Sequence, residues 1–414
     1  MMEKIGTYIT GYIKGKTPKI LYDYMQENTL PYLSPDYLRG KGFPEQYTEH
    51  SSNAVLVDDG EVIILWDGSN AGEVFISKFG ILASTMTLLE FNEEKIDKKY
   101  FGYAFQNLEY ILKAKTAGSG IPHADKGIIK RLDFYKPDKT EQIAIANILS
   151  KVDEAIASVQ KSIAAAECLK KSLMQNLLTG KMKPDGTFRT PEEFYIDKKF
   201  GKVPMGWEVK RVDDIFDFYP TASYSRSLLI ENGDCKYLHY GDIHTKFDTF
   251  LDVSEEPLPC IAKSMIKKFA YLKDGDIIFS DTSEDYEGVG KLVELFNVGD
   301  TKAISGLHTL LIRPKTDELI NGFKGYLFND ERVRLEFLKY VTGIKVYSIS
   351  KNCLSKVLLP IPSRTEQEQI KEKLDAVNNV IFVLKNKIKK LERLKKSLMQ
   401  SLLTGKVKFY YISK

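Results

Sequence analysis

The sequence predicts an α+β protein made of a duplicated unit, in which each of two mixed α/β domains is followed by a long helix. Three observations support this prediction. Residues 140–183 and 365–408 are near copies that lie 225 positions apart. The ends of the copies, LKKSLMQNLLTGKMK and LKKSLMQSLLTGKVK, differ at only two positions. The segments before the copies have diverged, so we expect a common scaffold that carries two dissimilar domains.

The predicted boundaries are the first domain at 1–137, the first helix at 138–183, the second domain at 184–362 and the second helix at 363–409. In each domain a turn precedes a strand, with DGE before VIILW in the first and DGD before IIF in the second. PYLSPDYLRG and KYLHYGDIHT occupy equivalent places ahead of that turn. Each of these two segments is expected to form a strand followed by a turn.

Both long helices have recognisable ends. Pro137 and Pro362 precede the TEQ triplets that begin the copies, and Gly180 and Gly405 lie where a C-terminal glycine cap belongs. Each helix is then about 37 residues long, on the order of 55 Å at 1.5 Å per residue.

Apolar residues recur along both helices at steps of three and four, which is a heptad seam of about five heptads. Because both helices carry the same seam, we expect them to pair as an intramolecular coiled coil, with packing on separate domains as the alternative. The heptads do not distinguish parallel from antiparallel pairing. Lys170 and Lys395 interrupt the seams at equivalent positions and are expected to fix the register. The seam residues are Leu149, Val152, Ile156, Val159, Ile163, Ala166, Leu173, Leu177, Leu374, Val377, Ile381, Leu384, Ile388, Leu391, Leu398 and Leu402.

Composition bounds the class of protein. The chain has 414 residues, 43% of them hydrophobic and 28% charged, which is ample for two independent cores. No apolar run approaches the roughly 18 residues of a membrane span, and the N-terminus has no apolar stretch of signal-peptide length. We therefore expect a cytoplasmic protein without membrane association. The scattered cysteines and histidines predict neither a disulfide framework nor a metal site, and the cysteines are expected to be reduced packing residues.

The charge distribution is uneven. The net charge is +4, with 13 basic and 5 acidic residues in 361–414 (net +8), and 7 basic and 5 acidic in 138–183 (net +2). The rest of the chain therefore carries 4 − 8 − 2 = −6, and DNA binding by the domains would need local basic patches. One face of the second helix is basic. We expect it to be a solvated flank or a docking face, with contact to DNA phosphates as the alternative. Its residues are Lys385, Lys387, Lys389, Lys390, Arg393, Lys395 and Lys396.

The common catalytic motifs are absent from the sequence. There is no GxxxxGK[ST], GxGxxG, GxSxG or HExxH, and no Asn-Pro-Pro-Tyr of adenine methyltransferases. Pro35-Asp36 with Asp97-Lys98-Lys99 imitates a nuclease motif, but its second half lies in a charged stretch that we interpret as solvated surface. No catalytic residue, metal or cofactor is therefore predicted for this chain.

The chain resembles the specificity subunit of type I restriction-modification systems. The resemblance covers the full chain and rests on the paired LKKSLMQ-x-LLTGK ends, the helix starts in FYKPDKTEQ and LPIPSRTEQ, and GWEVKRVDDIF at 206–216. It implies a non-catalytic subunit whose two target recognition domains are separated by an antiparallel coiled coil. Each domain would read one half of an asymmetric, bipartite sequence in double-stranded DNA.

The same resemblance implies partners. Two methyltransferase subunits would dock on the coiled coil and around each domain and supply S-adenosylmethionine, while motor-nuclease subunits would use ATP and Mg²⁺. The first domain departs from the family pattern, because it begins at MMEKIGTYI without a GWE segment. Its natural start is then further upstream, or the first unit is shorter.

Three alternatives remain open from the sequence. The chain could serve a fused methyltransferase-nuclease, act as a coiled-coil adaptor between proteins, or be a stand-alone enzyme with an unrecognised site.

Candidate DNA contacts combine cations for phosphates with groups for base edges. The alternative for each is an ordinary turn or strand residue. In the first domain they are Ser34, Asp36, Tyr37, Arg39 and Lys41, then Lys78, Ser84 and Thr85, with Ser119 and His123 near the domain's end. In the second domain they are His239, Tyr240, Asp242 and His244, then His308 and Thr309, then Lys345 and Tyr347.

Overall fold

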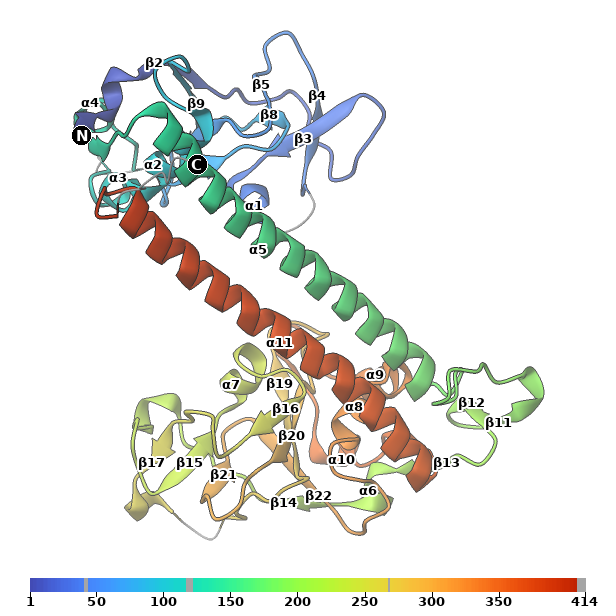
Figure 1. The fold of residues 1–414 in the computed structure, drawn as a ribbon. Coiled ribbons are helices and arrows are strands. Elements are labelled where there is room, and N and C mark those ends of the chain that lie inside the picture. The colour runs from blue at the N-terminus through green and yellow to red at the C-terminus, as the bar shows by residue number, and fades with distance from the viewer. Residues whose placement is uncertain (41–43, 117–121, 267–268, 408–414) are drawn as a thin grey trace, which may run out of the picture. The chain divides into compact units, whose positions relative to one another are not determined.

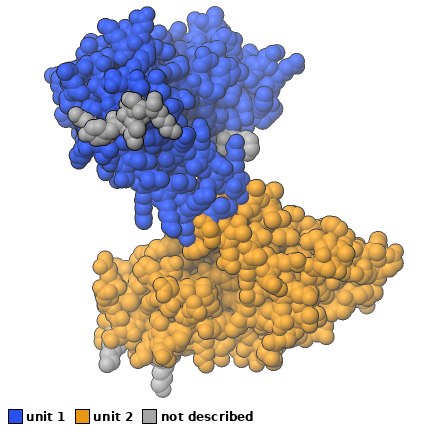
Figure 2. Space-filling model, viewed as in Figure 1, with its two compact units in different colours: residues 1–162, 384–414 blue, residues 163–383 orange. Residues whose placement is uncertain are grey.

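The computed structural model describes residues 1–40, 44–116, 122–266 and 269–407, drawn as a ribbon in Figure 1. The chain forms two compact units (Figure 2). Unit 1 contains residues 1–162 and 384–414, and unit 2 contains residues 163–383. Each unit therefore holds one globular domain with parts of both long helices, α5 (Lys139–Leu173) and α11 (Arg364–Leu402). These units group residues by their contacts and mix each domain with parts of both helices. They therefore do not test the domain boundaries that the sequence suggests, which remain a prediction.

The domain of unit 1 is built on two four-stranded sheets, ordered β2-β9-β6-β7 and β4-β3-β8-β5. The pair β3 and β8 is parallel, and β1 pairs with β10 antiparallel. The strands are β1 (Met2–Lys4), β2 (Ile9–Lys14), β3 (Thr29–Leu33), β4 (Tyr47–Glu49), β5 (Leu56–Val57), β6 (Val62–Leu65), β7 (Val74–Ile76), β8 (Gly80–Leu82), β9 (Met86–Phe91) and β10 (Asp133–Tyr135). The helices are α1 (Pro35–Leu38), α2 (Lys98–Asn107), α3 (Glu109–Ala114) and α4 (Lys126–Arg131).

The domain of unit 2 is built on a five-stranded sheet, β14-β22-β18-β20-β16, and a three-stranded sheet, β17-β15-β21. Three strand pairs, β11-β12, β13-β24 and β19-β23, complete it. The strands are β11 (Phe194–Asp197), β12 (Gly201–Pro204), β13 (Glu208–Arg211), β14 (Phe216–Tyr219), β15 (Cys235–Leu238), β16 (Phe250–Asp252), β17 (Cys260–Ile261), β18 (Ile277–Ser280), β19 (Thr282–Ser283), β20 (Leu292–Phe296), β21 (Ala303–Ser305), β22 (Thr309–Pro314), β23 (Tyr347–Ser348) and β24 (Leu358–Ile361). The helices are α6 (Val212–Ile215), α7 (Tyr240–Thr245), α8 (Lys324–Phe328), α9 (Glu331–Leu338) and α10 (Lys351–Leu354).

The strands β6 and β18 lie at the centre of their domains, which explains their unbroken apolar sequences. In β6, Val62 and Ile64 belong to one core, and Ile63 belongs to a second core on the other face. In β18, Ile277 and Ile278 are divided between two cores in the same way. Both faces of each strand are therefore buried, so both alternating sets of side chains are apolar.

The seams of the two long helices pack antiparallel within each unit. In unit 1, Leu149 near the start of α5 shares a core with Leu402 at the end of α11. In unit 2, Leu177 just beyond α5 shares a core with Leu374 near the start of α11. All sixteen predicted seam residues are buried or half-buried. The packing inside each unit supplies the antiparallel direction that the sequence left open, and the individual seam assignments stay a prediction.

Two polar positions and the glycine caps complete the description of the helices. Lys395 Nζ lies 2.7 Å from Asp153 Oδ1, an ion pair that joins α11 to α5 in unit 1 as the register prediction requires. Lys170 instead contacts Asp248 of the second domain at 3.3 Å, so its expected register role is wrong. Gly180 and Gly405 have φ of 68° and 71°, the left-handed conformation of a C-terminal cap, as predicted.

The four cysteines differ in burial. Cys235 and Cys260 are buried and Cys353 is half-buried, but Cys168 is exposed on α5, so it is not a packing residue. None of the helices in the described residues has the length and apolar character that a bilayer crossing requires.

Candidate nucleic-acid interface

The two domains hold equivalent turns with the same hydrogen bond from a buried tyrosine. In unit 1 the hydroxyl of Tyr32, on β3, accepts from the backbone N–H of Ser84 at 3.1 Å. In unit 2 the hydroxyl of Tyr237, on β15, accepts from the backbone N–H of Leu307 at 2.8 Å. The next residues along the chain, Thr85 and His308, therefore occupy equivalent positions.

The backbone beyond β6 extends this frame in unit 1. The N–H of Trp66 donates to the carbonyl of Thr85 at 2.7 Å, and the N–H of Ala124 donates to the carbonyl of Trp66 at 2.9 Å. Asp67 and His123 form an antiparallel bridge beside these bonds.

The backbone beyond β18 repeats the frame in unit 2. The N–H of Asp281 donates to the carbonyl of His308 at 3.1 Å, and the N–H of Ile349 donates to the carbonyl of Asp281 at 2.9 Å. Thr282 and Ser348 pair antiparallel, as Asp67 and His123 do in unit 1. We call these groups the strand-end sites. They consist of Trp66, Asp67, Thr85 and His123 in unit 1, and of Asp281, Thr282, His308 and Ser348 in unit 2.

The strand-end site of unit 1 is rich in polar and cationic groups. His123 Nδ1 lies 2.6 Å from Asp67 Oδ1, and Lys14 Nζ lies 2.7 Å from Asp67 Oδ2. Burial alone would raise the pKa of Asp67, but the hydrogen bonds from Lys14 and His123 hold it below its usual value. Lys14, His123 and Thr85 are all exposed, so they are placed to meet a polyanion.

A cation–aromatic cluster borders this site. The ammonium group of Lys126 lies 4.8 Å from the ring centroid of Tyr12 and 5.9 Å from that of Trp66. The two rings meet edge to face at 5.9 Å. The sequence reasoning did not select Trp66, Asp67, Lys14 or Lys126. Trp66 and Asp67 could have been noticed because they directly follow the buried VIIL strand, whereas no sequence signal pointed to Lys14 or Lys126.

The strand-end site of unit 2 gathers imidazole rings around Tyr240. The ring centroid of Tyr240 lies 4.6 Å from His239, 6.3 Å from His244 and 5.3 Å from His308. Asp281 Oδ1 lies 3.4 Å from Nδ1 of His308. The sequence selected all four of these aromatic and imidazole residues, and the structure brings them together.

Several of these side chains support the site from inside. His239 Nδ1 accepts from the N–H of Gly241 at 3.1 Å, and burial, with the neighbouring Arg226, lowers the pKa of His239. His244 Nε2 lies 2.8 Å from Ser280 Oγ and 2.9 Å from the carbonyl of Thr282. These contacts orient His239 and His244 inward.

Two predicted turns are short helices, which corrects the sequence interpretation. KYLHYGDIH forms β15 and then α7, capped by His239, whereas PYLSPDYLRG forms β3 and then α1. In α1 the hydroxyl of Ser34 accepts from the N–H of Tyr37 at 3.2 Å, and Pro35 occupies the first turn, where its missing N–H costs nothing. A helix of four to six residues is too short for apolar periodicity to reveal.

The remaining candidates of the first domain are mostly engaged with other side chains. Arg39 donates to Glu73 at 3.0 Å and to Asp36 at 2.8 Å. Tyr37 is buried, and the ammonium of Lys78 lies 4.1 Å from its ring centroid. Lys41 and Ser119 lie outside the described residues.

The remaining candidates of the second domain differ in access. Asp242 is fully buried between Arg226 and Lys246, at 2.8 and 2.9 Å, and Thr309 is buried with its hydroxyl 2.7 Å from that of Ser305. Lys345 is exposed and Tyr347 is half-buried.

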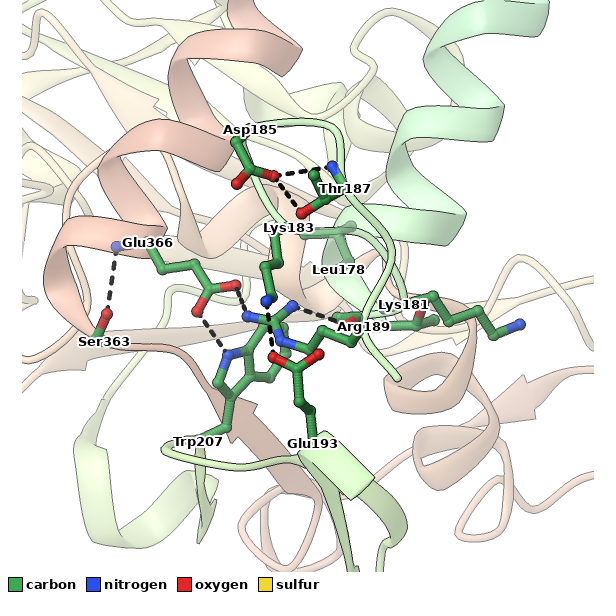
Figure 3. A network of polar contacts seen from close by, with 12 residues as sticks. Leu178, Lys181, Lys183, Asp185, Thr187, Arg189, Glu193, Trp207, Ser363 and Glu366 are labelled. Carbon is green, nitrogen blue, oxygen red and sulfur yellow. Dashed lines mark hydrogen bonds and ion pairs between the residues drawn. The ribbon is translucent and has the colours of Figure 1, made fainter. Parts of the chain in front are cut away.

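Away from the strand-end site, unit 2 contains a polar network that ties its long helices to the domain (Figure 3). Glu366, in the TEQ triplet of α11, accepts from Arg189 at 2.6 Å and from the indole N–H of Trp207 at 2.8 Å. Arg189 also donates to the carbonyl of Gly180 at 2.8 Å. Trp207 belongs to the GWE segment, so two sequence signatures of the chain meet at one carboxylate. Lys183 and Glu193 add an ion pair at 2.7 Å beside them.

No group of three or more potential metal ligands occurs within residues 1–40, 44–116, 122–266 and 269–407.

Comparison with known proteins places these features in a family. The family model described as "Type I restriction modification DNA specificity domain" matches residues 8–167 and 204–393. The chain is 31% identical over 407 residues to the "Type I restriction enzyme MjaVIII specificity subunit" of Methanocaldococcus jannaschii, covering 98% of this chain and 92% of that protein.

Two solved structures share the fold. The S subunit of a type I restriction-modification system from M. genitalium superposes with a TM-score of 0.59 at 15% identity, covering 97% of this chain and 96% of that one. A chain from a study of complex assembly and conformational transition of the type I R-M system gives 0.54 at 16% identity, covering 98% of both chains.

Proposed function

We propose that this chain, which belongs to the type I restriction-modification DNA specificity family, reads an asymmetric, bipartite sequence in double-stranded DNA with one half-site for each domain. The chain is a specificity subunit by family. The proposal concerns how it recognises its target and what assembles on it. Recognition would use the strand-end sites, and the chemistry would reside in partner subunits.

One observation supports this proposal above the others. The two domains keep the same hydrogen-bonded backbone around their strand-end sites, yet the side chains there differ. Thr85 in the first domain is equivalent to His308 in the second, and Trp66 is equivalent to Asp281. Equal frames with unequal side chains are what two readers of different sequences require. Base edges in the major groove distinguish all four base pairs, so different side chains on the two frames can select different bases.

The partners follow from the same proposal. Two methyltransferase subunits would dock on the paired helices and around the domains and would supply S-adenosylmethionine, and motor-nuclease subunits would use ATP and Mg²⁺. A relative in a structure of type I R-M complex assembly supports this view. Adenine methylation requires the base to leave the stack, which suits subunits that enclose the duplex.

A binding titration with the purified methyltransferase complex tests the proposal. We expect affinity for a bipartite duplex that falls steeply with salt and is lost when either half-site is changed. Affinity that ignores both half-sites would contradict it and would favour a protein adaptor. Turnover by the chain without partners would instead favour a stand-alone enzyme.

A further inference from the structure

We infer that His308 determines specificity in the second domain, where Nε2 of its imidazole accepts a hydrogen bond from the exocyclic amine of an adenine or a cytosine. This inference rests on the proposed DNA-reading function. It goes further by naming the residue, the atom and the class of base that this domain reads at one position.

The backbone of His308 is the first argument. Its φ is 53°, in the left-handed region that favours glycine, whereas the equivalent Thr85 has no positive φ. The side chain of His308 is nevertheless 47% exposed, so burial does not account for its presence. A non-glycine residue in this conformation is uncommon, although histidine adopts it more often than most, and such residues concentrate at functional sites.

The surroundings of the ring are the second argument. Nδ1 faces Asp281 at 3.4 Å, and the ring of Tyr240 meets the imidazole edge to face at 82°. Asp281 Oδ1 is buried without any hydrogen bond, and burial raises the pKa of this carboxyl while His308 opposes the rise. The carboxylate therefore gains from a proton on Nδ1, which leaves Nε2 as the acceptor in the neutral ring. Asp281 and Tyr240 thus act as positioning residues.

The neighbouring imidazoles are the third argument, because one nitrogen of each is already engaged within the protein. Nδ1 of His239 caps α7, and Nε2 of His244 meets Ser280 and Thr282. Among the described residues, Nε2 of His308 has no protein partner. His239 is buried and His244 is half-buried, so His308 offers the most exposed imidazole of this cluster.

The base class follows from the atoms in the major groove. Only the N6 amine of adenine and the N4 amine of cytosine donate there, whereas guanine and thymine present acceptors. An acceptor at Nε2 therefore selects adenine or cytosine. A good bidentate contact discriminates against the wrong base by about 5- to 150-fold, so this single hydrogen bond is expected at the lower end of that range.

The test uses the chain in complex with its methyltransferase subunits and a pool of duplexes randomised over both half-sites. Sequencing of the methylated products gives the preference at each base pair. We expect His308→Ala to relax one base pair of one half-site by about 5-fold. His308→Lys, which can only donate, should shift that base pair toward guanine or thymine. Asp281→Ala should relax the same base pair more weakly.

The controls separate this inference from the proposed function. His50→Ala removes an exposed imidazole of the first domain and should leave both half-sites unchanged. His308→Asn, which tolerates the left-handed backbone, guards against misfolding of the alanine variant. The inference is overturned if the His308 variants keep the wild-type preference everywhere, or if they weaken all positions equally. A wild-type complex without sequence preference would instead refute the proposed function itself.

Discussion

The side-chain carbonyl of Gln142 accepts a hydrogen bond from the backbone N–H of Asp97 at 2.8 Å. Gln142 is 1% exposed, and its amide also donates to the carbonyl of Pro137 at 2.9 Å. Gln367 repeats both contacts in unit 2, accepting from Ile320 and donating to Pro362. The glutamine of each TEQ triplet therefore helps to join a long helix to its own domain.

We predict that Gln142→Ala and Gln367→Ala each lower the free energy of unfolding by about 2–3 kcal/mol, because each leaves a buried N–H and carbonyl unsatisfied. Denaturant titration measures the loss. Gln369→Ala, at an exposed position of α11, should change stability by less than about 0.5 kcal/mol. Equal effects at positions 367 and 369 would argue against the anchoring role.

Breaking the Arg189–Glu366 pair should destabilise unit 2. The side chains are 9% and 14% exposed, so Arg189→Met would leave a largely buried carboxylate with one partner fewer. We expect a loss of about 3 kcal/mol, of which the double variant with Glu366→Met should recover a part. A double-mutant cycle by denaturant unfolding measures this coupling. Arg364→Ala, which removes an exposed pair with Asp317, serves as the control and should cost under about 0.5 kcal/mol.

The seam of the long helices offers a packing test. Leu149 is fully buried, so Leu149→Ala should cost about 2–5 kcal/mol. Leu394, on the same helix pair, is 47% exposed, and Leu394→Ala should cost under about 1 kcal/mol. Thermal unfolding of both variants checks the contrast, and similar losses would contradict the seam assignment.

Lys126 should contribute to DNA affinity without contributing to sequence preference. We expect Lys126→Ala to weaken binding of every duplex and to reduce the slope of log affinity against log salt by about 1. Lys126→Arg keeps the charge and should retain the wild-type slope. A salt series of binding titrations decides the matter, and a change in sequence preference would contradict a phosphate contact.

Asp67 should make stability depend on pH in the acid range. Its pKa is held below the ordinary aspartate value, so its contribution is present above that value and is lost as the pH falls through the lowered pKa. We expect wild-type stability to fall more steeply than that of Asp67→Asn as the pH drops below about 4. Unfolding titrations between neutral and acid pH test this, and parallel curves would refute it.

Features that depend on local spacing could be predicted from the sequence. The glycine caps and the duplicated strands follow from short motifs, so the cap at Gly180 was assigned correctly. The histidines around Tyr240 were also selected, because the duplicated order of the strands aligned the two domains.

Other features depend on residues that meet only in three dimensions. Asp281 and Trp66 could not be selected, since their partners lie between 19 and 68 positions further along the chain. Lys170 was assigned a register role because the heptad pattern contains no information about Asp248. The sequence did not predict that His239 caps the N-terminus of α7, because histidine is not among the residues preferred at the N-cap.

The hydroxyls of Tyr32 and Tyr237 hold the backbone of the adjoining turns through the N–H groups of Ser84 and Leu307, so the side chains of Thr85 and His308 are not needed for those bonds. Under the proposed function, an exchange at position 85 or 308 would alter what a domain prefers while the domain still folds. Single substitutions would then change the target of such a protein, and each half-site would change independently of the other.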